Sequence, residues 1–414
     1  MRGEAKRDAR SALGLLLAIN LFNYIDRQVL AAVEPNIRDT FFARGDPNAM
    51  AATGTLATAF LVSYMISAPL LGALADRFSR WVIVGVAVIL WSLASCASGL
   101  AATFVILVAT RVFVGLGEGG YGPAAPTILS DLYPLETRGR VLAVFNVALP
   151  VGSALGYVLG GIITAHLSWR YAFYFVTPPG ILLGLLCFAR RDHREARREP
   201  LNFNALAEIF RTRSYAFNVL AQTAFTFGIA GLGFWMAAYL RFRHQSEVTG
   251  KTIFGGILVV GGLVATLLGG WLGDKWRNRV PGAYFAVSGA GMLIAFPLFA
   301  AALFTPFPFA WVLIFGTIFF AFLNTGPANT ALANVIRPEI RATAFALNIL
   351  LIHAFGDAIS PPLIGLVAGH VNMTAAFLLV SATMLLAGVF WIAGRKYLDQ
   401  DTARIERQGK SSPA

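Results

Sequence analysis

The stretch R-V-F-V-G-L-G-E-G-G-Y-G-P-A-A-P-T-I-L-S-D, residues 111–131, places two charges, Arg111 and Glu118, inside an apolar window. A charge at the centre of a bilayer costs roughly 2.5–3.5 kcal/mol on insertion scales, so it is rarely there without a function. The spacing of these two residues is almost two helical turns, which puts both on one face, about 10 Å apart along the axis. The glycines and prolines that follow favour close packing and a bend. The stretch therefore predicts a membrane helix that carries part of a functional site.

The composition predicts a membrane protein along the whole chain. Apolar residues make up 57% of the sequence and charged residues only 13%, whereas a soluble domain carries nearer a quarter charged residues. Apolar windows of ~20 residues, each long enough to cross a bilayer, recur throughout. We predict twelve spans, at residues 12–33, 50–74, 81–101, 103–127, 141–163, 172–189, 216–239, 252–272, 282–303, 308–332, 342–367 and 373–394. The predicted fold class is an all-α membrane protein with 12 transmembrane helices.

The distribution of positive charge predicts the topology. The net charge is +12, and most of the 33 Lys and Arg residues fall before the first window, in alternate loops and in the tail. Positive residues accumulate on the cytoplasmic side, so we expect a multi-pass protein of the plasma or inner membrane with both termini in the cytoplasm. Basic segments beside a bilayer meet anionic lipid headgroups, and we expect no nucleic-acid partner.

The first window contains a polar stripe, N-L-F-N-Y-I-D-R at residues 20–27. Asn20, Asn23 and Arg27 have the spacing of one helix face, and Asp26 lies beside them. One interpretation is a seam of hydrogen bonds between helices. The interpretation that we favour is a protonatable acid with a cationic partner in a cavity, because an ionised aspartate inside a membrane needs a partner or a proton.

Two segments of the first half recur in the second half. G-A-L-A-D-R-F-S-R at residues 72–80 returns as G-W-L-G-D-K-W-R-N-R at 270–279, and P-L-E-T-R-G-R at 134–140 resembles P-E-I-R-A-T-A at 338–344. Repetition over half a chain predicts two related six-helix bundles. The expected parts are an N-terminal bundle (1–189), a basic cytoplasmic linker (190–215), a C-terminal bundle (216–394) and a cytoplasmic tail (395–414).

These residues also carry a family resemblance over essentially the whole chain. The G-x-L-x-D-R-x-x-R loop resembles the signature of the major facilitator superfamily, which implies two pseudo-symmetric six-helix bundles. N-Y-I-D-R and G-E-G-G-Y-G-P-A-A-P-T-I-L-S-D-L-Y resemble spinster-type transporters, whose animal members move sphingosine-1-phosphate or lysophospholipids. The chain reads Gly119-Gly120 where that type usually reads Ala-Ser. Organic-anion symporters with N-Y-x-D-R in the first helix are the nearest alternative.

The candidate site residues form three groups. We expect proton coupling and a substrate cavity at Asp26, Arg27, Arg111, Glu118, Asn23 and Tyr121. We expect a conformational gate at Gly72, Asp76, Arg77, Arg80, Arg138, Asp274 and Arg341, with the Asp76 carboxylate meeting the positive start of the helix near residue 342. Plain interfacial charge is the alternative for this group. A second-half site is expected at His353, Asp357 and Asn324, where a structural hydrogen bond is the alternative.

These observations predict a secondary transporter that works by alternating access. Nucleotide-binding and hydrolase motifs in a suitable context are missing from the sequence, so we expect no enzyme, no metal and no cofactor. The expected partners are protons and an amphipathic lipid such as a lysophospholipid or sphingolipid, handled by a monomer within the lipid bilayer. The alternatives are a proton-coupled transporter of organic anions or drugs and a non-transporting membrane receptor.

Overall fold

The computed structural model of the chain describes residues 2–75, 77–192, 208–337 and 340–411. All regular structure in these ranges is helical. The helices are α1 (Arg2–Phe41), α2 (Ala49–Ala75), α3 (Arg80–Gly99), α4 (Phe104–Leu132), α5 (Leu135–Asn146), α6 (Ala148–His166), α7 (Arg170–Cys187), α9 (Arg213–Phe242), α10 (Glu247–Trp276), α11 (Ala283–Phe304), α12 (Phe309–Phe322), α13 (Thr325–Val335), α14 (Arg341–Ile352), the π-helix η2 (His353–Asp357), α15 (Ser360–His370) and α16 (Met373–Ser411).

The helices confirm the predicted all-α membrane class. Eleven helical stretches of the described residues are long and apolar enough to cross a membrane, and they match the second to twelfth predicted windows. The helix α1 covers the first window, but Asp26, Arg27 and Glu34 interrupt its apolar sequence, and it is not one of the eleven. Three of the windows are built from more than one segment, namely α5 with α6, α12 with α13, and α14 with η2 and α15.

Contacts divide the chain into two compact units that do not follow the two halves of the sequence. Unit 1 contains residues 1–197, 233–256 and 361–370, and unit 2 contains 198–232, 257–360 and 371–414. The expected division into bundles, linker and tail stays a prediction, and residues 193–207 of the linker lie outside the described residues.

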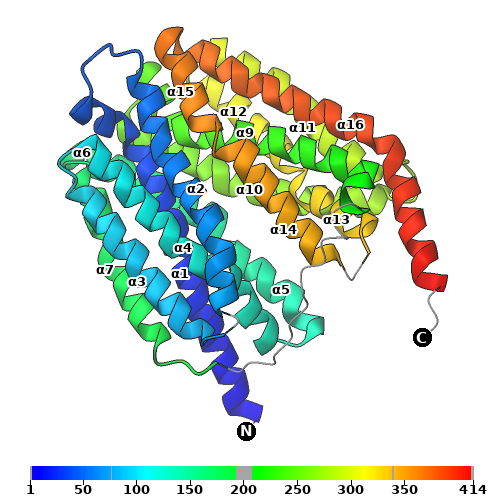
Figure 1. Cartoon of the computed structure of the whole chain (residues 1–414). Coiled ribbons are helices and arrows are strands. Elements are labelled where there is room, and N and C mark those ends of the chain that lie inside the picture. The colour runs from blue at the N-terminus through cyan, green and yellow to red at the C-terminus, as the bar shows by residue number, and fades with distance from the viewer. Residues whose placement is uncertain (1, 76, 193–207, 338–339, 412–414) are drawn as a thin grey trace. The chain divides into compact units, whose positions relative to one another are not determined.

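In unit 1, the helix α4 packs along α2 on one side and along α3 on the other, while α1 packs along α6 (Figure 1). Glycines make these contacts close. A Cβ atom on Gly115 would lie 2.1 Å from the carbonyl oxygen of Phe60 in α2, and one on Gly117 would lie 2.9 Å from the carbonyl oxygen of Ala87 in α3. Backbones that approach so closely leave room for hydrogen alone. The glycines of residues 111–131 thus place α4 in the middle of three helices.

Unit 1 also includes the segments 233–256 and 361–370, which pack against α2 and α6 through small residues. A Cβ atom on Gly54 of α2 would lie 2.6 Å from backbone atoms of Pro361, and one on Gly255 of α10 would lie 3.0 Å from the carbonyl oxygen of Ala154 in α6. This end of unit 1 carries the loop at residues 42–48, and we call it the Asp46 end. The opposite end, where α3 begins, is called the Arg80 end.

In unit 2, the helix α11 packs along α16 and α12. The C-terminal part of α16 continues beyond the apolar window and contacts the start of α9. There Asp401 accepts hydrogen bonds from the backbone nitrogen of Ser214 (3.0 Å) and from its hydroxyl group (2.6 Å). A carboxylate at this place satisfies donors that the first turn of a helix leaves free.

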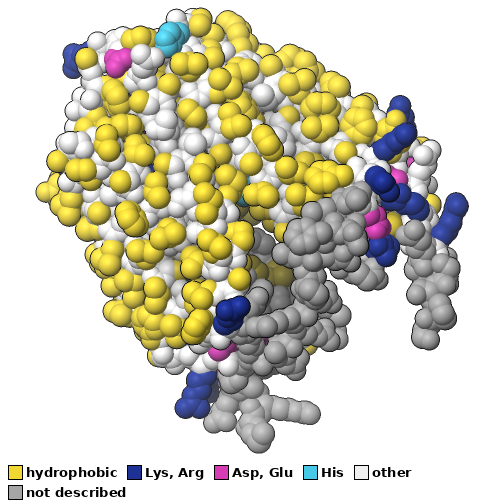
Figure 2. Space-filling model, in the orientation of Figure 1, with side chains coloured by type: hydrophobic (Ala, Val, Ile, Leu, Met, Phe, Trp, Pro, Cys, Tyr) yellow, Lys and Arg dark blue, Asp and Glu magenta, His cyan; other side chains and the backbone are white. Residues whose placement is uncertain are grey.

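The side-chain distribution on the visible face agrees with a lipid-facing surface. Figure 2 shows hydrophobic side chains over most of the described helices, and the Lys, Arg, Asp and Glu side chains lie toward the margins. Exposed large hydrophobic residues, among them Leu70, Val105 and Leu267, recur along these helices, whereas a water-soluble monomer rarely exposes a large apolar surface. A bilayer around these helices removes that cost.

Candidate functional site

The polar stripe of α1 is buried in unit 1. Asn20, Asn23 and Asp26 are at most 6% exposed, although hydrophobic residues surround them. Asn20 donates a hydrogen bond to the carbonyl oxygen of Phe145 in α5 (3.1 Å), which is a contact between helices. Buried polar groups cost free energy unless they are paired, so the partners of these side chains decide whether their burial is tolerated.

Arg27 of α1 pairs with Glu118 of α4. Its Nε donates to Oε2 of Glu118 at 2.8 Å, and its Nη2 donates to the same oxygen. The Glu118 side chain is 1% exposed and the Arg27 side chain is 27% exposed. A charge-assisted pair with two donors from one guanidinium fixes both side chains more firmly than a single hydrogen bond.

Three aromatic rings surround the Arg27 guanidinium. Its central carbon lies 4.7 Å from the ring centre of Phe60, 5.5 Å from that of Tyr24 and 5.6 Å from that of Tyr64. Aromatic faces attract cations, and the attraction grows where water is excluded. Arg27 is therefore held by one carboxylate and by rings from α1 and α2.

Asp26 has a different environment from its neighbour in the chain. Its Oδ1 accepts a hydrogen bond from the Ser95 hydroxyl of α3, and its Oδ2 lies 3.9 Å from Nη1 of Arg111 in α4. Arg111 itself donates to the Ser98 hydroxyl and lies over the ring of Phe173, 5.2 Å from its centre. Asp26 and Arg111 thus form a loose, buried pair beside the tight pair of Arg27 and Glu118.

The two pairs cross between the helices. Arg111 and Glu118 share one helix, as do Asp26 and Arg27, yet each acid faces the arginine of the other helix. The sequence predicted all four as site residues, and the structure brings them together in unit 1. The hydroxyl groups of Ser95 and Ser98, which hold Asp26 and Arg111, were missed because serine in an apolar window has no distinctive spacing.

Several buried polar atoms at this site lack a hydrogen bond to any described residue. They include Asp26 Oδ2 and Arg111 Nε, whereas the Asn23 amide group lies within hydrogen-bonding reach of the Glu118 carboxylate. Native proteins leave few buried polar atoms unsatisfied, and the exceptions often serve a function. The unpaired donors and acceptors of this site can therefore bind a proton, a water molecule or a polar group of a substrate.

Tyr121 lies near these residues but uses its polar atom elsewhere. It is 3% exposed, and its hydroxyl donates to the carbonyl oxygen of Leu16 in α1 at 2.9 Å. Its ring contacts Trp91 of α3, with ring centres 5.6 Å apart. Tyr121 therefore ties α4 to α1 and α3, and the hydrogen of its hydroxyl group is used in that contact.

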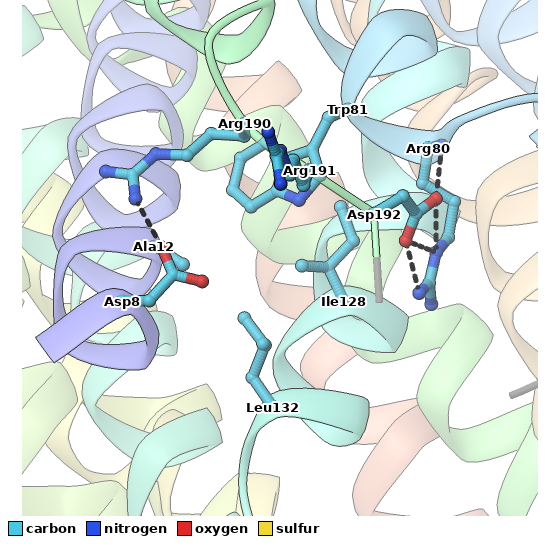
Figure 3. A pocket seen from close by; sticks show the side chains of 9 residues that line it. All are labelled: Asp8, Ala12, Arg80, Trp81, Ile128, Leu132, Arg190, Arg191 and Asp192. Atoms are coloured by element: carbon cyan, nitrogen blue, oxygen red, sulfur yellow. Dashed lines mark hydrogen bonds and ion pairs between the residues drawn. The ribbon is translucent and has the colours of Figure 1, made fainter. Parts of the chain in front are cut away.

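At the Arg80 end, Arg80 joins three segments of the first half. Its Nη1 donates to Asp131 of α4 at 2.6 Å, its Nη2 donates to Asp192 at 2.7 Å, and its backbone nitrogen also donates to Asp192 at 2.8 Å. Figure 3 shows Asp192 between Arg80 and the segment that carries Arg190. The Arg190 side chain donates a hydrogen bond to Asp8 of α1 at 2.9 Å. Asp131 and Asp192 were not predicted.

The other predicted gate residues are spread over the chain. Asp76 lies outside the described residues, and so does the side chain of Arg138. Arg77 is exposed, and a Cβ atom on Gly72 would lie 3.7 Å from Pro123, which is an ordinary contact. The expected contact of Asp76 with the start of α14 stays a prediction.

In unit 2, the predicted residues occupy separate places. Asp274 accepts a hydrogen bond from the Tyr284 hydroxyl at 2.9 Å, and Arg341 lies at the start of α14 with its Nη2 3.4 Å from the carbonyl oxygen of Ile336. His353 and Asp357 bond to each other, with Nδ1 and Oδ2 2.8 Å apart, inside the π-helix η2. Asn324 is buried, and its amide group donates to the carbonyl oxygen of Ala321.

Comparison with known proteins assigns the family. The sequence profile of the Major Facilitator Superfamily matches residues 16–356. Protein spinster homolog 3 of Danio rerio is 31% identical to this chain, over 97% of the chain and 88% of the relative. The Sphingosine-1-phosphate transporter SPNS2 of Xenopus tropicalis is 30% identical, over 97% of the chain and 84% of the relative. These matches define a multi-pass membrane transporter of the Major Facilitator Superfamily. Within that superfamily the chain belongs to the spinster family, as the sequence motifs predicted.

Solved structures support the fold. A bacterial homologue of the human lysosomal transporter spinster, in an inward-facing and unoccupied conformation, has a TM-score of 0.77 at 22% identity and covers 98% of this chain and 99% of its own. A D-xylose-proton symporter has a TM-score of 0.74 at 18% identity and covers 92% of this chain and 96% of its own. At these identities the two structures show the fold alone, which is the predicted twelve-helix, two-bundle fold of the superfamily.

Proposed function

We propose that this chain is a proton-coupled secondary transporter that moves an amphipathic lipid, such as a lysophospholipid or sphingolipid, by alternating access. The lipid class is suggested by the similarity of the chain to proteins such as the Sphingosine-1-phosphate transporter SPNS2. The observation that carries the proton coupling is the crossed pairing of Asp26 with Arg111 and of Glu118 with Arg27. We further propose that it works as a monomer in the plasma or inner membrane, with both termini in the cytoplasm.

The coupling follows from the chemistry of the two pairs. A proton on Asp26 or Glu118 neutralises the carboxylate and releases the facing arginine from its ion pair. The released guanidinium then binds the anionic headgroup of the substrate, and departure of the headgroup restores the pair and expels the proton. The proton is added at the unsatisfied Asp26 Oδ2 or on the Glu118 carboxylate.

The gate in this proposal includes the residues at the Arg80 end of unit 1. Gly72, Asp76, Arg77, Arg80 and Arg138 of the first half and Asp274 and Arg341 of the second half exchange partners when the two bundles rock about the substrate. The bonds of Arg80 with Asp131 and Asp192 support this role, because they join α3, α4 and the segment after α7 at one point.

A contribution from the second half is proposed for His353, Asp357 and Asn324. A π-helical turn inside a longer helix is rare and frequently lies at a functional site. The His353–Asp357 hydrogen bond places a titratable pair in that turn. We expect His353→Gln to lower the transport rate more than His370→Gln, a matched change at the exposed end of α15.

The deciding experiment measures proton movement in proteoliposomes that contain a pH dye. A panel of lysolipids and organic anions is added to wild type, Asp26→Asn and Glu118→Gln, with Asp399→Asn and Glu208→Gln in unit 2 as matched controls away from the site. We expect substrate-dependent proton flux in wild type and in both controls, and its loss in the two site variants. Substrate movement without proton flux, unchanged by either site variant, contradicts coupling.

The same panel separates the lipid from the alternative substrates. The ring-lined guanidinium of Arg27 suits any headgroup with negative charge, so organic anions remain the second candidate. Competition is the readout: a lysolipid that displaces a labelled organic anion, and is itself moved faster, supports a lipid transporter. An organic anion that is moved while every lysolipid is ignored contradicts it, and binding without any movement indicates a receptor.

A further inference from the structure

A second acid on α1 is buried beyond the site described above. Glu34 follows Arg27 by almost two turns on the same face, about 10 Å further along the helix. It is 0% exposed in unit 1. Burial of a carboxylate without full pairing is costly, so such a group rarely serves packing alone.

The partners of Glu34 are few. The Thr53 hydroxyl of α2 donates to its Oε1 at 2.7 Å, and Nε of Arg38, one turn further on α1, lies 3.8 Å from that same oxygen. Oε2 has no hydrogen bond to any described residue. One carboxylate oxygen is therefore held, and the other is available to a proton.

Other charged groups surround Glu34 from the helices packed on it. Asp39 of α1 and Arg241 of α9 act on it electrostatically and are bonded to each other at 2.5 Å. Lys251 of α10 is 1% exposed and is occupied by its own partners, the Glu247 carboxylate and the Thr164 hydroxyl. Arg241 and Lys251 thus have other contacts, and none of the cations near Glu34 donates a hydrogen bond to Oε2 within the described residues.

A cavity at the Asp46 end is lined by residues one helical turn away from this acid and from its hydrogen-bond donor. It has a volume of about 450 Å³, and its lining includes Arg38, Ala49, Met50, Arg241 and Gly369. Glu34 lies one helical turn before Arg38, and Thr53 lies one turn after Ala49 and Met50. The Thr53 hydroxyl also contacts the carbonyl oxygen of Met50 at 3.2 Å. The acid and its hydrogen-bond donor therefore lie directly behind wall residues of the cavity.

We propose that Glu34 is a proton-loading residue that exchanges protons between the water of this cavity and the interior of unit 1. A hydronium ion in the cavity gives its proton to Oε2, an O–H bond forms and water remains; release is the reverse step. The proposal rests on the proton coupling proposed above and adds the place where protons enter from the Asp46 end. The Thr53 hydroxyl keeps Oε1 occupied and so leaves Oε2 as the exchanging atom.

The first test is spectroscopic and needs no substrate. Infrared spectra of the full-length chain in lipid are recorded during a pH titration for wild type, Glu34→Gln, Glu34→Asp and Glu208→Gln. We expect a carboxylic-acid C=O band that changes with pH in wild type and in Glu208→Gln, is lost in Glu34→Gln and is shifted in Glu34→Asp. Identical titrations of wild type and Glu34→Gln overturn the proposal.

The second test is transport. We expect Glu34→Gln to lose the dependence of substrate flux on the pH at the Asp46 end, and Glu34→Asp, which keeps a carboxyl group, to retain it. An unchanged dependence in Glu34→Gln overturns the role in loading. Gel-filtration profiles and thermal unfolding show that each variant is folded. A wild type that moves substrate without protons contradicts the proposed coupling, whereas the infrared band judges Glu34 independently.

Discussion

Arg27 of α1 donates two hydrogen bonds to a single oxygen of Glu118 in α4, while the arginine on the same helix as Glu118 faces Asp26 instead. The consequence is that α1 and α4 are joined twice, once tightly and once loosely. Protonation of Asp26 disrupts only its loose contact with Arg111, whereas protonation of Glu118 disrupts two hydrogen bonds from Arg27. Asp26, with Arg111 at 3.9 Å, is therefore the acid that we expect to respond first.

The tight pair provides a prediction about stability. Arg27→Met leaves the Glu118 carboxylate buried without its cation, and breaking one side of a buried pair costs about 3–5 kcal/mol. We expect a loss at the lower end of that range, because Arg27 is 27% exposed. The double variant Arg27→Met with Glu118→Leu removes both charges and should recover part of the loss. Denaturant unfolding in micelles measures the two single variants Arg27→Met and Glu118→Leu and the double variant, and strictly additive losses contradict a direct pair.

The glycines of α4 provide a second prediction. Gly115→Ala puts a methyl group 2.1 Å from the carbonyl oxygen of Phe60, so the helices must separate. Overpacking of this kind costs about 1–3 kcal/mol. Gly72→Ala is the matched control, since its nearest atom is 3.7 Å away, and alanine suits a helix better than glycine. We expect a lower unfolding temperature for Gly115→Ala only. Equal effects of the two changes contradict the close contact.

The arginine at the start of α3 provides a third prediction. Arg80 reaches Asp131 and Asp192 with different nitrogens of one guanidinium. A lysine ammonium lacks this planar fork and does not reproduce both contacts. Hydrogen bonds to charged groups contribute about 1.5–3 kcal/mol each, so Arg80→Lys should be measurably less stable. Arg77→Lys, in the exposed part of the same segment, serves as control. A stability of Arg80→Lys equal to that of the control contradicts the two-sided contact.

The pH dependence of unit 2 provides a fourth prediction. Hydrogen bonds from Arg337 lower the pKa of Glu208 below its ordinary value of 4.5. A group whose pKa is lower in the folded state stabilises that state at pH values above its unfolded pKa, and the contribution is lost as the pH falls through the folded pKa. Wild type should therefore lose more stability than Glu208→Gln on acidification below about pH 4.5. Parallel stability curves for the two proteins contradict the bond.

Much of the fold could be predicted because hydropathy and charge asymmetry act over whole helices. The eleven apolar spans match their windows, and α1 was recognised despite the charges of Asp26 and Arg27. The division into compact units could not be predicted in the same way. It depends on backbone contacts such as that of Gly54 with Pro361, and a glycine in a sequence does not reveal which helix will approach it.

The sequence predicted the charged residues of the site, but it did not predict which acid pairs with which arginine. Helical periodicity places Arg111 and Glu118 on one face of α4, but it does not give the rotation of α1 against that face, which decides that Arg27 meets Glu118. For Tyr121, the position in the sequence suggested a side chain in the cavity, but it did not show that the hydroxyl donates a hydrogen bond to the carbonyl oxygen of Leu16 in α1. Glu34 was missed because it lies just past the apolar window, although it extends the polar face of α1.

The glycine contacts of α4 also decide how movement reaches Glu118. Gly115 touches the backbone of α2 and Gly117 touches the backbone of α3, with no flexible side chain between them to absorb a displacement. We therefore expect a shift of α2 or α3 to move α4, and with it the Glu118 carboxylate, by a similar distance. Glu118 should thus move together with α2 and α3, so that a displacement of these helices changes the hydrogen bonds between Glu118 and Arg27.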